Sequence, residues 1–511
     1  MVVSHKEATM ISANTIFDHV QCPHRPVMDS SKPESERDET SAFIEMLWEQ
    51  GVEHGASILA SLGVTADLSQ VPVEQREAAT RAAMDRGEPL IYRGRLSVDD
   101  LLGEPDLLEL QSNGGYVPGA IKSGSGLEGG DDDTEGRIKR NYAVQLGHFS
   151  NILERLAVGD GSHLTFVVDG EASRVPYDLD QPQGVRNLQT WYDLYQNALK
   201  EVRSNLCGAT KTLPAMGATC KLCHWQGSCK ADVVAANDLS LIAELGRSKR
   251  DTLIRLIPTV KALADTNIDN FISGKKTVFP GIGPGTLEKY QARARLLCDP
   301  KAIPYLKSPV NLPSRSREIY FDIESDPFKG NFVYLHGMVE RDRTKNEMDS
   351  AQFHPFFADG STPEHEEAVF AAAWGYLTER IKDSTVFYYS QFEATSYKRL
   401  ARKFPSVCSV DDVEQLFATP EMIDLYAIVK RHTEWPCNNF SIKTLAVYCG
   451  FHWRDESPSG AASIEWYRRW LETGDLAIKD RICVYNNDDC IATGYVVDAI
   501  RRMDCRTAIA A

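Results

Sequence analysis

Long hydrophobic runs are missing from this 511-residue sequence, and no apolar stretch approaches the roughly 18 residues of a membrane-spanning helix. The first twenty residues lack the charged-then-apolar layout of a signal peptide. Twelve cysteines are too few for a disulfide scaffold in a chain of this length, and in a reducing compartment clustered cysteines more often bind metal or iron–sulfur clusters. We therefore expect a cytoplasmic protein that has no membrane partner.

Internal repeats and the G-x-x-x-x-G-K-[ST] phosphate loop are also absent, so the sequence contains no recognisable helicase motor. The net charge of −16 argues, on its face, against a nucleic-acid partner. Residues 247–307, however, hold 12 Lys and Arg against 5 Asp and Glu, a net charge of +7 that leaves −23 for the remainder. This basic segment is either an electrostatic footprint for phosphates or a solvated helical linker.

The order of hydrophobic patterns predicts a multidomain α/β protein. In its first part we expect helices at 41–63 and 141–159 and strands at 89–97, 106–110 and 116–122. Helices and turns follow, and a strand at 318–327 then opens a region that alternates strands and helices to the end. We assign the domain boundaries 1–240, 241–310 and 311–511, with ample room for buried cores.

A C-x2-C-x5-C motif closes the first region. The motif consists of Cys220, Cys223 and Cys229. Two residues between thiolates let both point at one metal centre, and three cysteines are one short of a four-cysteine site. Cys22 is the best candidate for the missing ligand, ahead of Cys207. The spacing does not choose between iron and zinc. Structural zinc using His24 or His224, and buried free cysteines, are the alternatives.

The stretch "YVPGAIKSG" (116–124) ends a predicted strand on Lys122. Together with His54, Asp106 in "GEPDLL", Gln145 in "YAVQLGHF" and the cysteine motif, it resembles the RecB-like branch of the PD-(D/E)XK nuclease superfamily. The resemblance is to the subgroup in which one cysteine before the nuclease core and three after it hold a 4Fe–4S cluster that staples the fold. It implies that the cluster ligands are Cys22, Cys220, Cys223 and Cys229.

The resemblance also implies a divalent-metal site with Asp106 and His54 as ligands, followed by Gln145 on the next helix. Lys122 would orient the attacking water or stabilise the developing charge. Ala120 stands at the D/E position and has no oxygen to offer. We therefore expect this first site to be disabled, by natural loss or by a deliberate substitution. In the alternative interpretation, the strand is an ordinary one and Lys122 is a surface lysine.

The basic segment contains "FPGIGPGTLEKYQARARLL" (279–297), which predicts a turn followed by a helix. Gly281 and Gly283 resemble the glycine turn of a helix-hairpin-helix motif, in which backbone N–H groups at a helix start grip a phosphate. With Lys289, these glycines are the candidate nucleic-acid-binding residues. A purely structural helical connector is the alternative.

The last region carries a second acidic pattern. Asp322 and Glu324 are two residues apart on a predicted strand, which puts both carboxylates on one face. Tyr485 and Asp489 are four apart in a helical stretch and share a helix face. This D-x-E and Y-x-x-x-D pattern resembles the DEDD exonucleases of the RNase H-like, DnaQ-like fold. The resemblance requires a fourth acid, and Glu393 stands where aspartate is more usual.

The resemblance implies hydrolysis of phosphodiester bonds with two metal ions, Mg²⁺ or Mn²⁺, held by the four acids, with Tyr485 positioning the water. Asp424 would support the site or cap a helix. Nearly the whole chain resembles bacterial RecB-family nucleases with an RNase H-like C-terminal domain. This implies a nuclease acting on DNA, single-stranded by preference, in repair or in defence against foreign DNA, with a helicase or another repair or defence protein as partner. Ala120 and Glu393 favour a non-catalytic nucleic-acid-binding scaffold instead, and a ribonuclease using the C-terminal domain is a further alternative.

Overall fold

The computed structural model describes residues 10–129, 136–185, 187–345 and 351–506 of a mixed α/β, multidomain protein. The chain divides into two compact units. The first runs to Pro214 and includes Ala218–Cys229, and the second comprises Ala215–Gly217 and the chain from Lys230 onward. No helix in the described ranges combines the length and apolar character needed to cross a membrane. By this division of the chain, the basic segment 247–307 lies in the second unit together with the C-terminal region.

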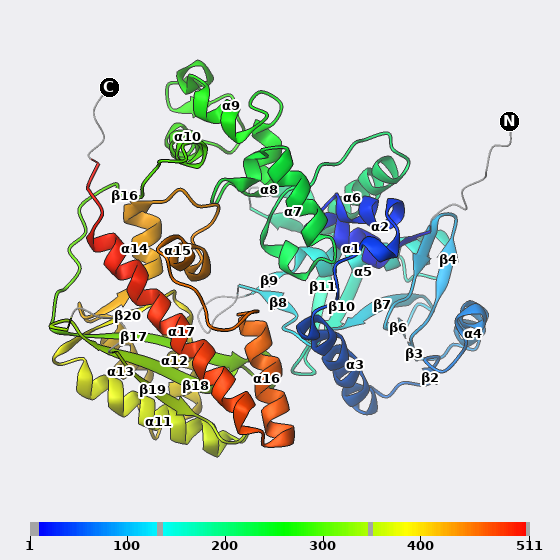
Figure 1. Ribbon diagram of the computed structural model, residues 1–511. Helices are drawn as coiled ribbons and strands as arrows, with labels where there is room; N and C mark the ends of the chain where they lie inside the picture. Colours follow the sequence, from blue (N-terminus) through cyan, green and yellow to red (C-terminus); the bar gives the residue numbers. More distant parts are fainter. Residues whose placement is uncertain (1–9, 130–135, 186, 346–350, 507–511) are drawn as a thin grey trace. The chain divides into compact units, whose positions relative to one another are not determined.

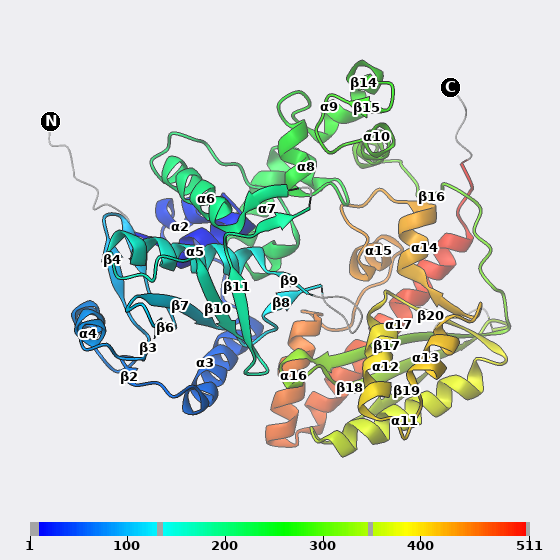
Figure 2. The same ribbon diagram turned by 180° about the vertical axis from the view of Figure 1, so that it is seen from behind.

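The first unit is built on a six-stranded sheet with the order β11-β10-β7-β6-β3-β2 (Figures 1 and 2). Its strands are β2 (Ala66–Asp67), β3 (Leu90–Tyr92), β6 (Leu107–Leu110), β7 (Tyr116–Ile121), β10 (Leu164–Val168) and β11 (Arg174–Asp178). β7 lies in the middle, antiparallel to β6 and parallel to β10. Helix α5 (Arg140–Arg155) packs against β7, and α1 (Ala13–Gln21) and α6 (Trp191–Leu206) pack against α5. The strand that contains "YVPGAI" is therefore central and buried.

Two predicted helices are confirmed as α3 (Ala42–Leu62) and α5, but the strand predicted at 89–97 is broken. β3 ends at Tyr92, and β4 (Leu96–Val98) joins a separate sheet with β1 (Ile11–Ser12) and β5 (Leu101–Gly103). Arg93 between them has a φ of 56°, in the left-handed region. A Cβ on Gly94 would stand only 2.9 Å from Leu108 Cδ1. The alternation of apolar residues over 89–97 does not reveal the break between β3 and β4, because Arg93 is not a residue type that is typical of turns.

The start of the second unit is a helical connector with its own apolar core. Its elements are α8 (Gly246–Leu253), α9 (Val260–Asp265), α10 (Pro284–Cys298) and the small hairpin β14 (Ile272–Ser273) and β15 (Lys276–Thr277). Leu263, Leu287 and Tyr290 are fully buried between these elements. Gly281 has a φ of 74° and Gly283 is the N-cap of α10, as the predicted turn before a helix requires.

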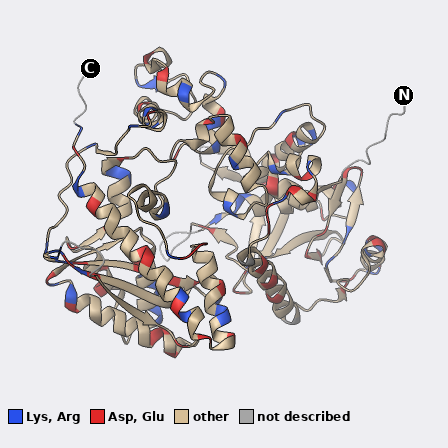
Figure 3. Ribbon diagram, viewed as in Figure 1, with Lys and Arg blue, Asp and Glu red and all other residues tan. Residues whose placement is uncertain are grey.

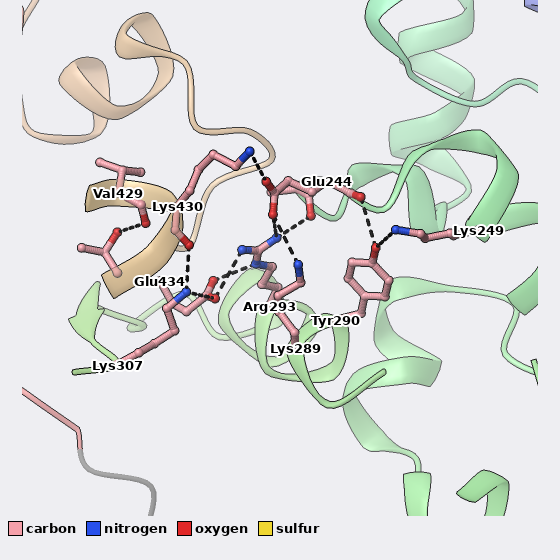
Figure 4. Close-up of polar contacts among 11 residues, drawn as sticks. Glu244, Lys249, Lys289, Tyr290, Arg293, Lys307, Val429, Lys430 and Glu434 are labelled. Atoms are coloured by element: carbon pink, nitrogen blue, oxygen red, sulfur yellow. Dashed lines mark hydrogen bonds and ion pairs between the residues drawn. The ribbon is translucent and has the colours of Figure 1, made fainter. Parts of the chain in front are cut away.

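A network of charges joins the connector to the C-terminal region (Figure 4). The side chains of Arg293, on α10, and Glu434, on β22 (Thr433–Glu434), are each 2% exposed and pair at 2.7 Å between Nε and Oε2. Arg293 also contacts Glu244 at 2.9 Å, Lys307 donates to Glu434 at 3.1 Å, and Lys430 pairs with Glu244 at 3.3 Å. Because neither buried charge can reach water, each depends on the other to offset its lost hydration.

The C-terminal region contains a five-stranded sheet with the order β19-β18-β17-β20-β21. Its strands are β17 (Arg317–Asp326), β18 (Phe332–Asp342), β19 (Gln352–Phe357), β20 (Ser384–Tyr388) and β21 (Met422–Asp424). β17, β18 and β19 are antiparallel neighbours, whereas β20 runs parallel to β17, and β21 runs parallel to β20. The predicted strand at 318–327 is thus the central one, with helices on both faces.

Side chains of β17 alternate between two cores. Ile319 and Phe321 face the core completed by α11 (Pro363–Arg380), α12 (Phe392–Lys403) and α13 (Val410–Phe417). Tyr320 faces the opposite core, completed by α14 (Leu425–His432), α15 (Ile442–Tyr448) and the long α17 (Leu476–Arg501), which crosses the sheet in Figure 1. Asp322 and Glu324 continue the period of Tyr320 and therefore point to the α17 face.

Candidate active site

Three carboxylates meet between β17 and α17. Asp322, Glu324 and Asp489 each offer an oxygen, and these oxygens lie within 4.8 Å of one another. In the part of the chain that the structure describes, this acidic trio is the one group of three or more His, Cys, Asp or Glu side chains spaced to share a metal ion. Carboxylate oxygens are the ligands that Mg²⁺ prefers, and Mn²⁺ accepts the same donors. The donor set therefore fits the divalent metal that the acids predicted.

Burial and mutual repulsion disfavour the charged form of the trio. Burial raises the pKa of Glu324 to about 8, and the neighbouring Asp489 adds to the rise. Burial likewise raises the pKa of Asp322 well above its usual range, with Asp489 and Glu324 as further causes. The pKa of Asp489 is raised for the same first reason. A bound dication would relieve this repulsion, which is a second observation in favour of a metal site.

The stability of the metal-free protein is expected to fall as the pH rises. Glu324 has a folded-state pKa near 8, against 4.5 when exposed, so between these values the folded chain keeps a proton that the unfolded chain has lost. In EDTA, the melting temperature of the second unit should therefore drop between pH 5 and pH 8. Thermal scans of the wild type and Glu324→Gln measure this; the variant should show the smaller drop. A melting temperature that rises over this range would contradict the expectation.

Residues outside the predicted set hold the trio in place. Asn486 Nδ2 donates to Asp322 Oδ2 at 2.7 Å, and Trp453 Nε1 donates to Asp489 Oδ1 at 2.7 Å. Gly337 lies opposite Asp322 on β18, and a Cβ there would be only 1.6 Å from Asn486 Oδ1. The sequence holds one indication of Asn486: an asparagine is seldom found on the buried face of a helix unless it has a polar partner there. Nothing in the sequence distinguishes Trp453 from other tryptophans.

Tyr485 is covered by a lysine that the sequence did not single out. Lys443 Nζ donates to the Tyr485 hydroxyl at 3.0 Å and to the Pro458 carbonyl at 2.7 Å. It lies 4.6 Å from the centre of the Tyr485 ring and 5.5 Å from that of Trp453. Burial raises the pKa of Tyr485, and so does the charge of Asp489. The phenol therefore stays protonated at neutral pH.

Glu393, the predicted fourth acid, lies outside the trio. It is in the first turn of α12 and is 2% exposed. Burial raises its pKa to about 8, and its Oε2 has no hydrogen-bond partner among the described residues. It nevertheless raises the pKa of Asp322, so the two acids share one electrostatic environment. Of the two roles predicted for Asp424, capping is observed: it accepts the Ala427 N–H at 3.0 Å.

In the first unit, β7 and α5 bring two predicted residues together. Lys122 Nζ donates to Gln145 Oε1 at 2.7 Å, and Gln145 Nε2 donates to Asn14 Oδ1, on α1, at 3.1 Å. Burial lowers the pKa of Lys122, and the negative charge of Asp106 partly offsets this effect. Lys122 is thus a half-buried lysine with a side-chain hydrogen bond, and not a freely exposed surface one.

Asp106 precedes β6, and both of its oxygens already have partners. Oδ2 accepts the Ile121 N–H at 2.9 Å, and Oδ1 pairs with Arg93 Nη1 at 3.2 Å. Arg93 is the residue that breaks the predicted strand. The cation that neutralises this carboxylate is therefore supplied by the protein itself.

Ala120 and His54, the other two predicted positions of this region, are also surrounded by protein contacts. Ala120 is 1% exposed and belongs to an apolar cluster with Leu146 of α5 and Val167 of β10. His54, on α3, shares a hydrogen bond of 3.1 Å with the carbonyl of Asp169, which follows β10. Asp106 and His54 do not enter any metal-ligand group of the described residues. Both oxygens of Asp106 are thus engaged by protein groups, and Ala120 adds no carboxylate beside it.

The four predicted cluster ligands lie on neighbouring short elements of the first unit. Cys22 is the C-cap of α1, Cys220 lies in a 3₁₀ turn (Ala218–Leu222), Cys223 follows that turn, and Cys229 lies in α7 (Gln226–Ala235). Burial raises the pKa of Cys223, with Cys22 and Cys220 among the smaller causes, so these thiols are close in space. No three cysteine sulfurs of the described chain come within 4.8 Å of one another. The iron–sulfur cluster stays a prediction.

Hydrogen bonds already tie the two cysteine-bearing segments together. Asp29 accepts from Trp225 Nε1 at 2.8 Å and lies 2.7 Å from His224 Nε2, and Asp38 accepts the Gly227 N–H at 2.7 Å. His24, the other histidine considered as a zinc ligand, shares a hydrogen bond of 2.8 Å with Thr212 through Nδ1. Each histidine thus has one ring nitrogen engaged with the protein.

At least five of the twelve basic residues in 247–307 form ion pairs within the second unit. Lys289 Nζ lies 3.5 Å from Glu244 Oε2. The basic residues of the connector that form ion pairs are Arg250, Lys261, Lys289, Arg293 and Lys307. Figure 3 shows acidic positions beside the basic ones along these helices. The excess of positive charge therefore serves structural contacts at several of its positions, which favours the connector interpretation over a phosphate footprint.

Comparison with known proteins agrees with the geometry of the last region. Residues 319–501 match the family described as RNase_H superfamily. A search of curated proteins found no match to the chain. The matched segment begins on β17 and ends with α17, so it contains the acidic trio. The C-terminal region is therefore an RNase H-like domain, which indicates a nuclease that acts on nucleic acid.

Proposed function

We propose that the protein is a metal-dependent nuclease whose phosphodiester hydrolysis takes place at Asp322, Glu324 and Asp489. The observation that carries this proposal is the convergence of their oxygens within 4.8 Å inside the domain that matches the RNase_H superfamily. These three side chains would hold Mg²⁺ or Mn²⁺, and Glu393 would supply a carboxylate beside them. A metal held there supplies an activated water and stabilises the leaving oxygen.

The protein's own residues prepare this site. Asn486 donates to one oxygen of Asp322 and Trp453 donates to one oxygen of Asp489, which restricts the rotation of both carboxylates. The Tyr485 hydroxyl remains protonated and able to donate a hydrogen bond to the attacking water or to a phosphate oxygen. The substrate is most simply single-stranded DNA, and repair or defence against foreign DNA is the proposed setting.

We further propose that the first unit is not a working nuclease in this chain. Asp106 is paired with Arg93, and Ala120 supplies no oxygen. The first unit would then bind the nucleic-acid substrate without cutting it, and the positive charge of Lys122 would contribute to that binding. A ribonuclease activity of the C-terminal domain is the second candidate, because the RNase H-like fold serves both polymers.

Cleavage of end-labelled single-stranded DNA and RNA with Mn²⁺ tests both proposals. The chain should cut or trim one of these polymers, and EDTA should abolish the cutting. Ala120→Asp should then add new cleavage, whereas Ala120→Asn, of equal size and without charge, should not. If the aspartate variant behaves like the asparagine variant, the missing carboxylate at position 120 is not what keeps the first unit inactive. If EDTA leaves cleavage unchanged, metal-dependent hydrolysis is wrong.

A 4Fe–4S cluster on Cys22, Cys220, Cys223 and Cys229 is proposed as the staple of the first unit. Protein purified without oxygen should be brown and should contain about four iron and four sulfide per chain. Cys223→Ser should lose the colour and most of the iron, and Cys207→Ser, an exposed cysteine of the same unit, is the matched control. A colourless protein with one zinc per chain would replace the iron assignment by zinc.

A further inference from the structure

Lys443 occupies a special position in the proposed active site. It lies in the first turn of α15, whose N-cap Ser441 accepts the Thr444 N–H. Its ammonium reaches the Tyr485 hydroxyl on α17 at 3.0 Å and the Pro458 carbonyl at 2.7 Å. It therefore bridges three segments that are far apart in sequence, and it does so at the tyrosine next to the acidic trio.

The bond between Lys443 and Tyr485 has only one possible direction. A lysine ammonium has three protons and no lone pair, so the tyrosine oxygen must be the acceptor. The phenol keeps its own proton for another acceptor. Asp489 lies one turn further along α17, and its charge raises the pKa of the Tyr485 phenol, so this carboxylate is close to the hydroxyl. Tyr485 thus stands between Lys443 and a carboxylate of the trio.

The segment around Lys443 is locked to α17 by a second set of contacts. Arg454 donates from its backbone N–H to Asp488 Oδ2 and from Nε to Asp488 Oδ1, both at 2.8 Å. The neighbouring Trp453 donates to Asp489. The Asp488 side chain is 2% exposed, whereas that of Arg454 is 52% exposed. Lys443 is therefore held over the tyrosine by its own two hydrogen bonds, and the segment that follows it is anchored to α17.

We propose that Lys443 is a positioning residue for the hydrolysis: its ammonium fixes the Tyr485 hydroxyl so that the phenol proton is directed into the acidic trio. This inference rests on the proposed function. Without Lys443 the hydroxyl could rotate, and its proton would be aimed correctly for only part of the time. The chemical step should therefore slow, while substrate binding should change little because the Lys443 ammonium is already engaged by Tyr485 and Pro458.

The test is a double-mutant cycle on cleavage of labelled single-stranded DNA with Mn²⁺, using Lys443→Met, Tyr485→Phe and the two combined. Losing a residue that orients a catalytic group typically costs about 10- to 100-fold. We expect Lys443→Met to lower kcat by that factor with KM within about threefold of the wild type. The double variant should be no slower than Tyr485→Phe alone, because the lysine acts through the hydroxyl. Lys443→Arg should recover part of the loss.

Lys398→Met, which removes an ion-paired lysine from α12 of the same domain, is the matched control and should keep wild-type kcat. Two results would overturn the inference while the nuclease assignment stands: Lys443→Met at wild-type kcat, or losses that multiply in the double variant. A wild-type protein without any EDTA-sensitive cleavage is a different result. It would remove the proposed function, and the role of Lys443 with it.

Discussion

Asp322→Asn should abolish hydrolysis while leaving the domain folded. Asparagine has the same shape, and its amide oxygen can still accept the Asn486 hydrogen bond that Asp322 Oδ2 accepts at 2.7 Å. It cannot provide the charge that a metal ion needs. The metal contribution is worth several kcal/mol of transition-state stabilisation, so we expect the rate to fall by about 10³-fold or more. Single-turnover cleavage with Mn²⁺ gives the measurement.

Stability should move in the opposite direction. Burial raises the pKa of Asp322 well above its usual range, so the ionised carboxylate is unfavourable in the folded metal-free protein. Replacing it by a neutral amide should raise the melting temperature in EDTA at pH 8.5 and remove the stabilisation that Mn²⁺ gives to the wild type. Asp342→Asn, an exposed acid at the far end of β18, is the control. Turnover within tenfold of the wild type in Asp322→Asn would exclude the trio as the reaction centre.

Arg293→Met should destabilise the second unit strongly. The change leaves Glu434 buried with only Lys307 at 3.1 Å to offset its charge. Breaking a buried pair from one side costs about 3–5 kcal/mol, and the remaining lysine argues for the lower end of that range. For a unit of this size the melting temperature should fall by roughly 5 °C. Urea or thermal unfolding followed by tryptophan fluorescence measures the loss.

Removing the second charge should return most of that stability. In Arg293→Met combined with Glu434→Gln, no unpaired carboxylate stays buried, so the double variant should be more stable than Arg293→Met. Lys261→Met breaks an ion pair whose side chains are 73% and 65% exposed, and it should leave the melting temperature almost unchanged. A loss in Arg293→Met no larger than this control would show that the network contributes little.

The acidic trio was predictable from sequence because its spacing follows secondary structure. Two residues along a strand and four along a helix place Asp322 with Glu324 and Tyr485 with Asp489, whatever the rest of the fold does. The contact between strand and helix needed the resemblance to a known fold. Lys443 and Trp453 were beyond prediction, because they reach the trio from α15 and from the segment that follows it, through tertiary packing alone.

Charge and strand patterns were less informative for the other regions. A net charge of +7 does not say which cations are paired, and Arg293 is in fact buried beside Glu434. In the first unit, the family resemblance placed Lys122 and Gln145 in one site, and the two side chains share a hydrogen bond. Arg93, by contrast, reaches Asp106 from a left-handed backbone conformation that no sequence pattern indicates. Sequence predicts what local geometry dictates, and it misses partners brought together by turns and long-range contacts.

The geometry of the acidic trio depends on the absence of a side chain at Gly337. Any side chain at this position would displace Asn486, and Asn486 is what orients Asp322. A homologue that keeps every acid but has alanine here would look intact in an alignment of catalytic residues and would still carry a misaligned centre. To decide whether such a domain is active, the glycine at this position should therefore be checked together with the carboxylates.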